Sequence, residues 1–180
     1  KENTYVLSFD VKDETSLISI NLTDFSFKKE QFPFEKFEKK SGSNSFLHQN
    51  ILYQLTANSE ALSLTGIDLK TKKTIETYRV NSSTEIDFKN TPLLQQSENG
   101  KTRELKNAAK FLSKIDFENV GISIYNTPNY NLFTIGGVRE VASGGNIALG
   151  FGLTLGGIMG GVLIDPSAVM ESGNIQTIYF

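Results

Sequence analysis

The sequence predicts an all-β or β-dominated domain made of antiparallel meander sheets. Apolar residues alternate with polar ones over several short segments, which is the period of half-buried strands. Turn-forming residues separate these segments at short, even intervals. The 180 residues include 13 Phe and 6 Tyr, and these side chains fit pleated, half-buried surfaces. The length suffices for one domain with a sizeable core or for two small ones, and we expect residues 1–180 to form a single β-rich domain or a fragment of a larger one.

Composition and charge exclude several classes of function. The net charge is −2 and the pI is near 5.5, so the chain lacks the basic excess that proteins use to bind phosphate backbones. The absence of Cys excludes disulfides, thiolate zinc sites and Cys nucleophiles. No signal peptide is visible, and the start without Met favours a processed, exported chain. We therefore expect an extracytoplasmic location: periplasmic, outer-surface or secreted.

The first eighty residues contain two successive sets of predicted strands. In the first set, residues 5–10 and 17–22 flank a polar turn, and a third strand starts at 25–27. The Gly- and Ser-rich residues 41–45 are predicted to form a loop. The second set follows at residues 50–55, 62–69 and 74–80.

The two sets align without gaps at an offset of about 47 residues, the spacing of a blade-sized repeat. Ile20-Asn21-Leu22 falls on Ile67-Asp68-Leu69. In residues 66–75, a hydrophobic-Asp-hydrophobic step is followed by a Lys/Thr turn and a new strand. With this pattern, residues 3–80 resemble β-propeller blade repeats, and two ordinary meanders in another β fold are the alternative. The resemblance implies a chain that belongs to a larger assembly or pairs with another copy, because a propeller needs at least four blades.

One amphipathic helix is predicted near residues 101–115. Leu105, Ala108, Ala109, Leu112 and Ile115 recur at helical spacing, and basic side chains fill the other faces. Because the apolar face is small, we expect this helix to pack on a sheet rather than lie on a membrane.

The last third of the chain contains predicted strands and an unusual uncharged segment. Residues 121–125 and 130–135 form a predicted hairpin that Gly136-Gly137 ends, and residues 175–180 form a last strand. The segment 141–164 is Gly-rich and apolar, with large residues alternating with Gly or other small ones over 147–156. This alternation favours a strand over a membrane-spanning helix with Gly152, Gly156 and Gly160 on one face. A phosphate-binding loop is excluded, since the G-x-G-x-x-G spacing is missing.

No catalytic, cofactor-binding or metal-binding residue can be assigned from the sequence, and no cofactor is expected. The single histidine, His48, lies in a polar stretch and is predicted to be a solvated loop residue. Carboxylate pairs such as Asp10 with Asp68, or Glu35 with Glu38, have no pattern that selects them.

The aromatic residues 25–37 offer a possible binding surface, although the alternation of Phe25 and Phe27 favours the core for these two.

We therefore expect a non-catalytic binding or interaction module of a bacterial envelope or of the exterior of the cell. Its partner is an unknown protein or small molecule, and nucleic acid is disfavoured. One alternative is a membrane-associated envelope protein anchored by residues 141–164. Another is a carboxylate-dependent hydrolase domain. An exposed apolar or aromatic patch would favour the interaction module, and a concave pocket with two carboxylates and a perturbed pKa would favour the hydrolase.

Overall fold

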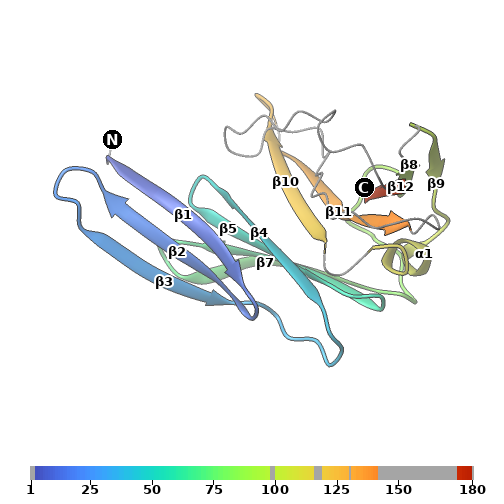
Figure 1. Cartoon of the computed structure of the whole chain (residues 1–180), viewed down its shortest axis with the longest axis horizontal. Helices are drawn as coiled ribbons and strands as arrows, with labels where there is room; N and C mark the ends of the chain where they lie inside the picture. The colour runs from blue at the N-terminus through green and yellow to red at the C-terminus, as the bar shows by residue number, and fades with distance from the viewer. Residues whose placement is uncertain (1–2, 98–99, 116–118, 130, 142–173, 180) are drawn as a thin grey trace.

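The computed structural model consists of three antiparallel sheets, called sheets A, B and C, that follow one another along the chain (Figure 1). It describes residues 3–97, 100–115, 119–129, 131–141 and 174–179. The predicted β-dominated class with antiparallel meander sheets is confirmed.

Sheets A and B are meanders in which neighbouring strands pair in chain order. Sheet A contains β1 (Thr4–Val11), β2 (Glu14–Asn21) and β3 (Phe27–Pro33). Sheet B contains β4 (Gly42–His48), β5 (Ile51–Ala57), β6 (Ala61–Asp68) and β7 (Lys73–Asn81). Five of these strands match the predicted segments, and β3 begins at Phe27, at the end of the predicted start 25–27. Strand β4 was not predicted.

The repeat seen in the sequence relates sheet A to three strands of sheet B. Adding 47 to both partners of the pair Thr4↔Asn21 gives Ile51↔Asp68, which is the equivalent pair of the β5–β6 hairpin. The turns that follow also correspond. Asn21 and Asp68 each accept a backbone hydrogen bond from the residue two positions on, at 2.8 Å and 2.9 Å. Phe25 and Lys72, again 47 residues apart, both have positive φ, at 58° and 59°.

Sheet C is assembled from strands that are distant in sequence. Its order is β10 (Val120–Asn126), β11 (Asn131–Val141), β12 (Asn174–Tyr179), β8 (Leu94–Ser97) and β9 (Thr102–Glu104). The helix α1 (Ala108–Leu112) follows β9 and contributes buried residues to the core.

The predicted helix over 101–115 is wrong in its extent. Residues 102–104 form β9, and the Leu105 N–H donates to the Leu93 carbonyl at 2.7 Å, so extended pairing continues up to Leu105. The helix begins only after Asn107, whose side chain accepts from the Lys110 N–H at 3.0 Å. Cross-strand pairing therefore overrides the helical period in the first part of the segment.

Sheet B lies between two cores, because alternate residues of β5 point to opposite sides. Leu52 packs with Leu17 and Phe32 of sheet A. Tyr53 and Leu55 belong to the larger core that includes sheet C and α1. The rings of Tyr53 and Phe133 meet edge to face with centroids 5.0 Å apart, which links sheets B and C.

The predicted loop at residues 41–45 is wrong over residues 42–45, because these belong to β4. Each pairs with β5, from Gly42↔Ala57 onward. The polar side chains that suggested a loop make tertiary hydrogen bonds: Asn44 accepts from the Ile122 N–H at 3.1 Å, and the Ser45 hydroxyl donates to Asp10 at 2.6 Å. Polar residues are therefore used here to join β4 to β10 and β1.

The strand predicted to stop at Gly136-Gly137 continues to Val141. Both glycines pair with β10 and β12. A Cβ on Gly137 would lie 2.9 Å from Ile115 Cγ2 and 3.2 Å from the Asn119 carbonyl oxygen. Glycine is thus required here for a close approach of neighbouring chain segments, and not for a turn. The strand predicted at 175–180 corresponds to β12.

Among the described residues, we find no helix with the length and apolar character needed to cross a membrane. Residues 142–164 of the Gly-rich segment, for which a strand or a membrane helix was predicted, lie outside the described residues.

Candidate functional site

The outer face of sheet A carries a group of apolar side chains, beside the polar residues Glu14, Ser16, Lys29 and Gln31 on the same side. Leu17 and Phe32 point inward to sheet B, so the alternate residues of each strand point outward. Strand register places Leu7 beside Ile18 and sets Tyr5, Ile20 and Phe27 in one row. We call this surface the apolar face; it consists of Tyr5, Leu7, Phe9, Val11, Ile18, Ile20 and Phe27.

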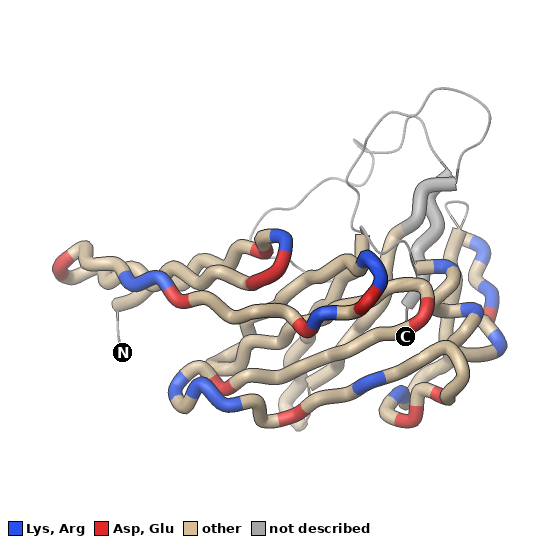
Figure 2. The backbone as a smooth tube through the Cα atoms, turned by 90° about the horizontal axis from the view of Figure 1, so that it is seen from below, with Lys and Arg blue, Asp and Glu red and all other residues tan. Residues whose placement is uncertain are grey.

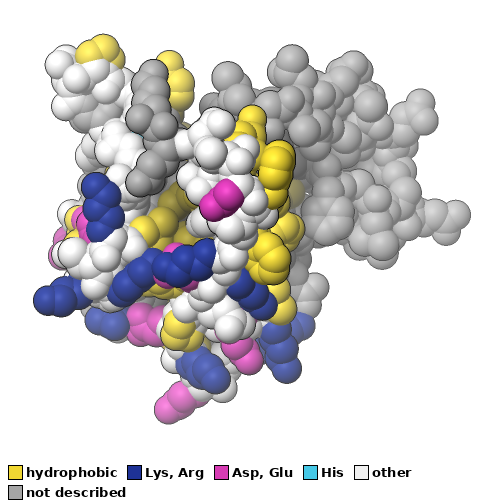
Figure 3. Space-filling model, turned by 90° about the vertical axis from the view of Figure 1, so that its left-hand side faces the viewer, with side chains coloured by type: hydrophobic (Ala, Val, Ile, Leu, Met, Phe, Trp, Pro, Cys, Tyr) yellow, Lys and Arg dark blue, Asp and Glu magenta, His cyan; other side chains and the backbone are white. Residues whose placement is uncertain are grey.

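The aromatic side chains of the apolar face are unusually accessible. Tyr5 is 63% exposed, Phe9 is 49% exposed and Phe27 is 76% exposed. Phe25, in the adjoining β2–β3 turn, is 77% exposed. Figure 3 views this end of the molecule and shows hydrophobic side chains along one flank as well as in a hollow. The expectation that Phe25 and Phe27 face the core is therefore wrong, whereas Phe32 and Phe34 are buried.

Phe25 is also in an unfavourable backbone conformation. Its φ of 58° lies in the left-handed region, which is an outlier for a bulky aromatic residue. Glycine or asparagine would adopt this conformation at lower cost. An exposed aromatic residue kept in a strained turn contributes little to folding, and such strain gathers at functional sites.

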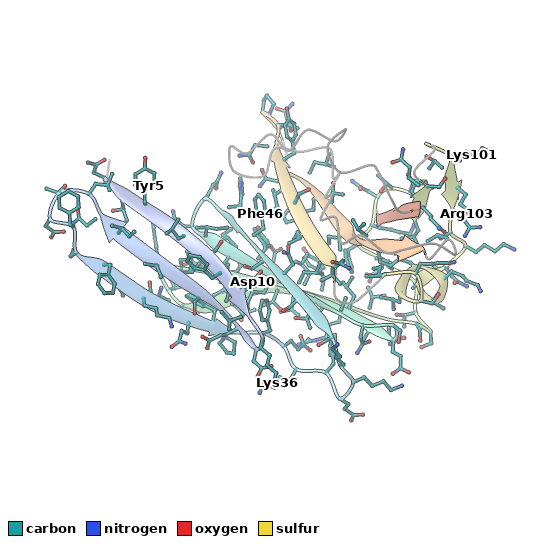
Figure 4. All side chains as sticks on the ribbon, viewed as in Figure 1. Tyr5, Asp10, Lys36, Phe46, Lys101 and Arg103 are labelled. Carbon is teal, nitrogen blue, oxygen red and sulfur yellow. The ribbon has the colours of Figure 1, made fainter. Side chains whose placement is uncertain are left out.

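Buried polar contacts hold sheet A in place against sheet B. Gln54, which is buried, donates from Nε2 to the Thr15 hydroxyl at 3.0 Å and to the Phe32 carbonyl at 2.9 Å. At the far end of β1, Asp10 accepts from the backbone N–H of Ser45 at 2.7 Å. Figure 4 shows Tyr5 and Asp10 towards opposite ends of β1. The apolar face is thus presented by a sheet with a fixed position.

A second candidate site is the β3–β7 groove, an open hollow of about 860 Å³ between sheets A and B. It is lined by Lys28, Glu30, Phe32, Glu35, Lys72 and Arg79, among others. Glu30 forms ion pairs with Lys28 at 3.1 Å and with Lys72 at 2.6 Å. The Lys72 ammonium also lies 5.2 Å from the centre of the Phe32 ring.

Both carboxylates of the groove are held in the charged form. The hydrogen bond from Lys72 lowers the pKa of Glu30, against the effect of burial. Burial acts to raise the pKa of Glu35, but hydrogen bonds from Arg79 and Ser63 and the Arg79 charge outweigh it, so the pKa is lowered. A general acid at neutral pH needs a raised pKa. These two carboxylates are therefore ion-pair partners and are not suited to act as a proton donor.

The carboxylate pairs considered from the sequence have different roles. Asp10 joins β1 to β4, whereas Asp68 closes the β6–β7 turn by accepting from Lys70 and Thr71. Glu35 and Glu38 both line a smaller hollow of about 380 Å³. The carboxylate of Glu35 accepts hydrogen bonds from Arg79 and Ser63.

The Glu35–Arg79 pair makes a testable contribution to stability at neutral pH. Because the folded-state pKa of Glu35 is lowered, its contribution is present above the unfolded pKa of about 4.3 and is lost as the pH falls. We expect Glu35→Gln to lower the free energy of unfolding at pH 7 by less than about 1 kcal/mol, since Arg79 is largely exposed and screened. Urea unfolding at pH 7 and pH 3 measures this. The difference from wild type should be smaller at pH 3 than at pH 7, and the exposed Glu104→Gln serves as control. A difference as large at pH 3 as at pH 7 would contradict the assignment.

His48 is the last residue of β4 and is buried, so the prediction of a solvated loop histidine is wrong. It pairs with Ile51 across a tight turn in which Gln49 has a φ of 54°. Its Nε2 has no hydrogen-bond partner among the described residues.

The described residues contain no group of three or more His, Asp or Glu side chains placed to hold a metal ion. In Figure 2, acidic and basic residues of the described chain are dispersed along the tube and do not form one basic stripe. Figure 3 likewise shows both signs of charge around the hollow.

Comparison with known proteins finds no matching family model, no matching curated protein and no matching solved structure. The function must therefore be inferred from the site alone.

Proposed function

We propose that this chain is a non-catalytic protein-interaction module whose docking surface is the apolar face of sheet A. The observation that carries the proposal is the exposure of Tyr5, Phe9 and Phe27 on one face of a single sheet. Contiguous exposed apolar surface on a soluble domain is typical of an interaction site.

The composition of the apolar face supports a polypeptide partner. Aromatic residues are enriched, and charged residues depleted, at the centres of protein–protein interfaces. The strand that contributes most to the face, β1, has one charged residue among eight, Asp10, and the carboxylate of Asp10 is engaged with β4. An anionic membrane would favour a lysine-rich surface, and the apolar face is not lysine-rich.

Site-specific photo-crosslinking tests this function. A photoreactive amino acid is placed at Leu7 on the apolar face, or at Ile75 on β7 as the matched control, and each protein is irradiated in an extract of its source cells. The two sites are apolar and similarly exposed, at 45% and 52%. We expect a polypeptide adduct from position 7 and none from position 75. The absence of an adduct, or the same adducts from both positions, would contradict the proposal.

Phe25→Gly is expected to separate stability from binding. Because glycine relieves the left-handed strain, the free energy of unfolding should rise by about 1 kcal/mol. Loss of an exposed aromatic ring should at the same time reduce the yield of the position 7 adduct. Urea unfolding and the crosslinking assay measure the two effects. A loss of stability together with unchanged crosslinking would show that Phe25 has a purely structural role.

A further inference from the structure

We propose that the partner seated on the apolar face is a second copy of this chain, packed sheet A against sheet A about a two-fold axis. This inference rests on the proposed function, because it identifies the partner that the same surface binds. A two-fold contact requires that one surface be complementary to itself. Three properties of the apolar face meet this requirement.

The first property is the exposed area. The rings of Tyr5, Phe9, Phe25 and Phe27 are between 49% and 77% exposed. At about 200 Å² for each aromatic side chain, they leave on the order of 500 Å² in contact with water. The exposed parts of Leu7 and Val11 add to this. A stable interface uses about 800 Å² on each partner, so the apolar face together with Phe25 of the adjoining turn approaches the size that a dimer needs.

The second property is the balance of charge. By strand register, Lys29 lies on the outer side beside Ile18, and Glu14 lies on the same side opposite Val11 and Pro33. The outer side of sheet A thus carries one cation and one anion beside the apolar face, and Glu14 also accepts hydrogen bonds from Ser16 and Gln31 there. Two copies can meet without a net excess of like charge, and a two-fold rotation allows Glu14 of each copy to approach Lys29 of the other.

The third property is the way in which the strands present their side chains. Two sheets pack face to face when each has an apolar face of alternating residues, at a separation of about 10 Å. Sheet A already packs in this manner on its inner side, where Leu17 and Phe32 contact Leu52 of sheet B. The outer side repeats the alternation with Tyr5, Leu7 and Phe9.

A different dimer, with two β1 strands paired edge to edge, is distinguishable from this one. Among the described residues, β1 pairs with β2 alone. The Asn3 carbonyl accepts from the Leu22 N–H at 2.7 Å, so the groups of Asn3 face β2 and, by alternation, the N–H of Val6 faces the free edge. Val6→Pro therefore removes an edge donor and leaves the β1–β2 ladder intact.

Sedimentation velocity of the full chain tests the proposal. The protein is measured at concentrations up to about 100 µM, at which a dimer with a micromolar Kd is largely assembled. We expect the wild type to form a dimer. Leu7→Lys should raise the dimer Kd by about 100-fold, because two charges are buried per dimer, one from each copy. The matched variant Ile75→Lys and the edge variant Val6→Pro should change the Kd less than about threefold. Circular dichroism on each variant verifies that the strands are retained.

The outcomes separate this inference from the proposed function. If the wild type stays monomeric while position 7 crosslinks to a different polypeptide, the dimer proposal is wrong. The proposed function as an interaction module is then still supported. A dimer that Val6→Pro abolishes and Leu7→Lys does not would overturn face-to-face packing in favour of edge pairing. A monomeric wild type that gives no adduct at position 7 would contradict both the dimer and the proposed interaction function. If Leu7→Lys does not fold, Leu7→Ser replaces it and should weaken the dimer in the same direction.

Discussion

Replacing Phe111 by alanine is expected to lower the free energy of unfolding by about 3–5 kcal/mol. Phe111 is the aromatic residue of α1 and is fully buried in the core shared by sheets B and C. The substitution removes a large apolar side chain and leaves a cavity that the packed strands can only partly fill. Since domains have 5–15 kcal/mol of stability in total, this change should lower the urea midpoint severely.

Tyr125→Ala is the control for this measurement. Tyr125 lies on β10 and is 64% exposed, so its removal should cost less than about 0.5 kcal/mol. Equal losses for the two variants would mean that α1 is not packed against the sheets as described.

Replacing Leu52 by alanine is expected to cost about 2–5 kcal/mol and to loosen sheet A. Leu52 is fully buried on the side of β5 that faces sheet A, where it packs with Leu17 and Phe32. This small core and the hydrogen bonds from Gln54 hold the two sheets together. Relative to wild type, hydrogen exchange in the variant should therefore accelerate more in β2 and β3 than in sheet C. The urea midpoint should also be lower.

Leu132→Ala provides the comparison, because Leu132 is 41% exposed on β11. It should leave the exchange of β2 and β3 unchanged. Uniform acceleration across all three sheets in the Leu52 variant would contradict a separate interface between sheets A and B.

Much of sheets A and B was predictable from the sequence. The alternation of residues 5–10 and 62–69 depends on nothing beyond the strand period, and β1 and β6 form there. The offset of 47 residues is also present in the structure, where the equivalent pairs Thr4↔Asn21 and Ile51↔Asp68 are followed by equivalent turns. Local patterns succeed where neighbouring segments in the chain pair with each other.

The candidate site was predictable only in part. The aromatic content of residues 25–37 pointed to a possible surface, but alternation alone assigned Phe25 and Phe27 to the core. Alternation shows that a strand has two different faces, yet it does not show which of them another sheet covers. Phe32 is buried and Phe27 is exposed because sheet B covers the inner side of sheet A and no described residue covers the outer side.

The sequence by itself determined the strand period, the repeat, the Lys/Thr turn after Asp68 and the absence of cysteine chemistry, since each depends on residues close together in the chain or on composition alone. Only the tertiary structure decided that the polar residues 42–45 form a strand, that residues 102–104 form β9 and that Gly137 lies within β11. Each of these depends on a partner outside the segment itself, such as Ile122 for Asn44 or Ile115 for Gly137. Long-range contacts of this kind override local preference because burial and completed hydrogen bonds outweigh propensities of a few tenths of a kcal/mol.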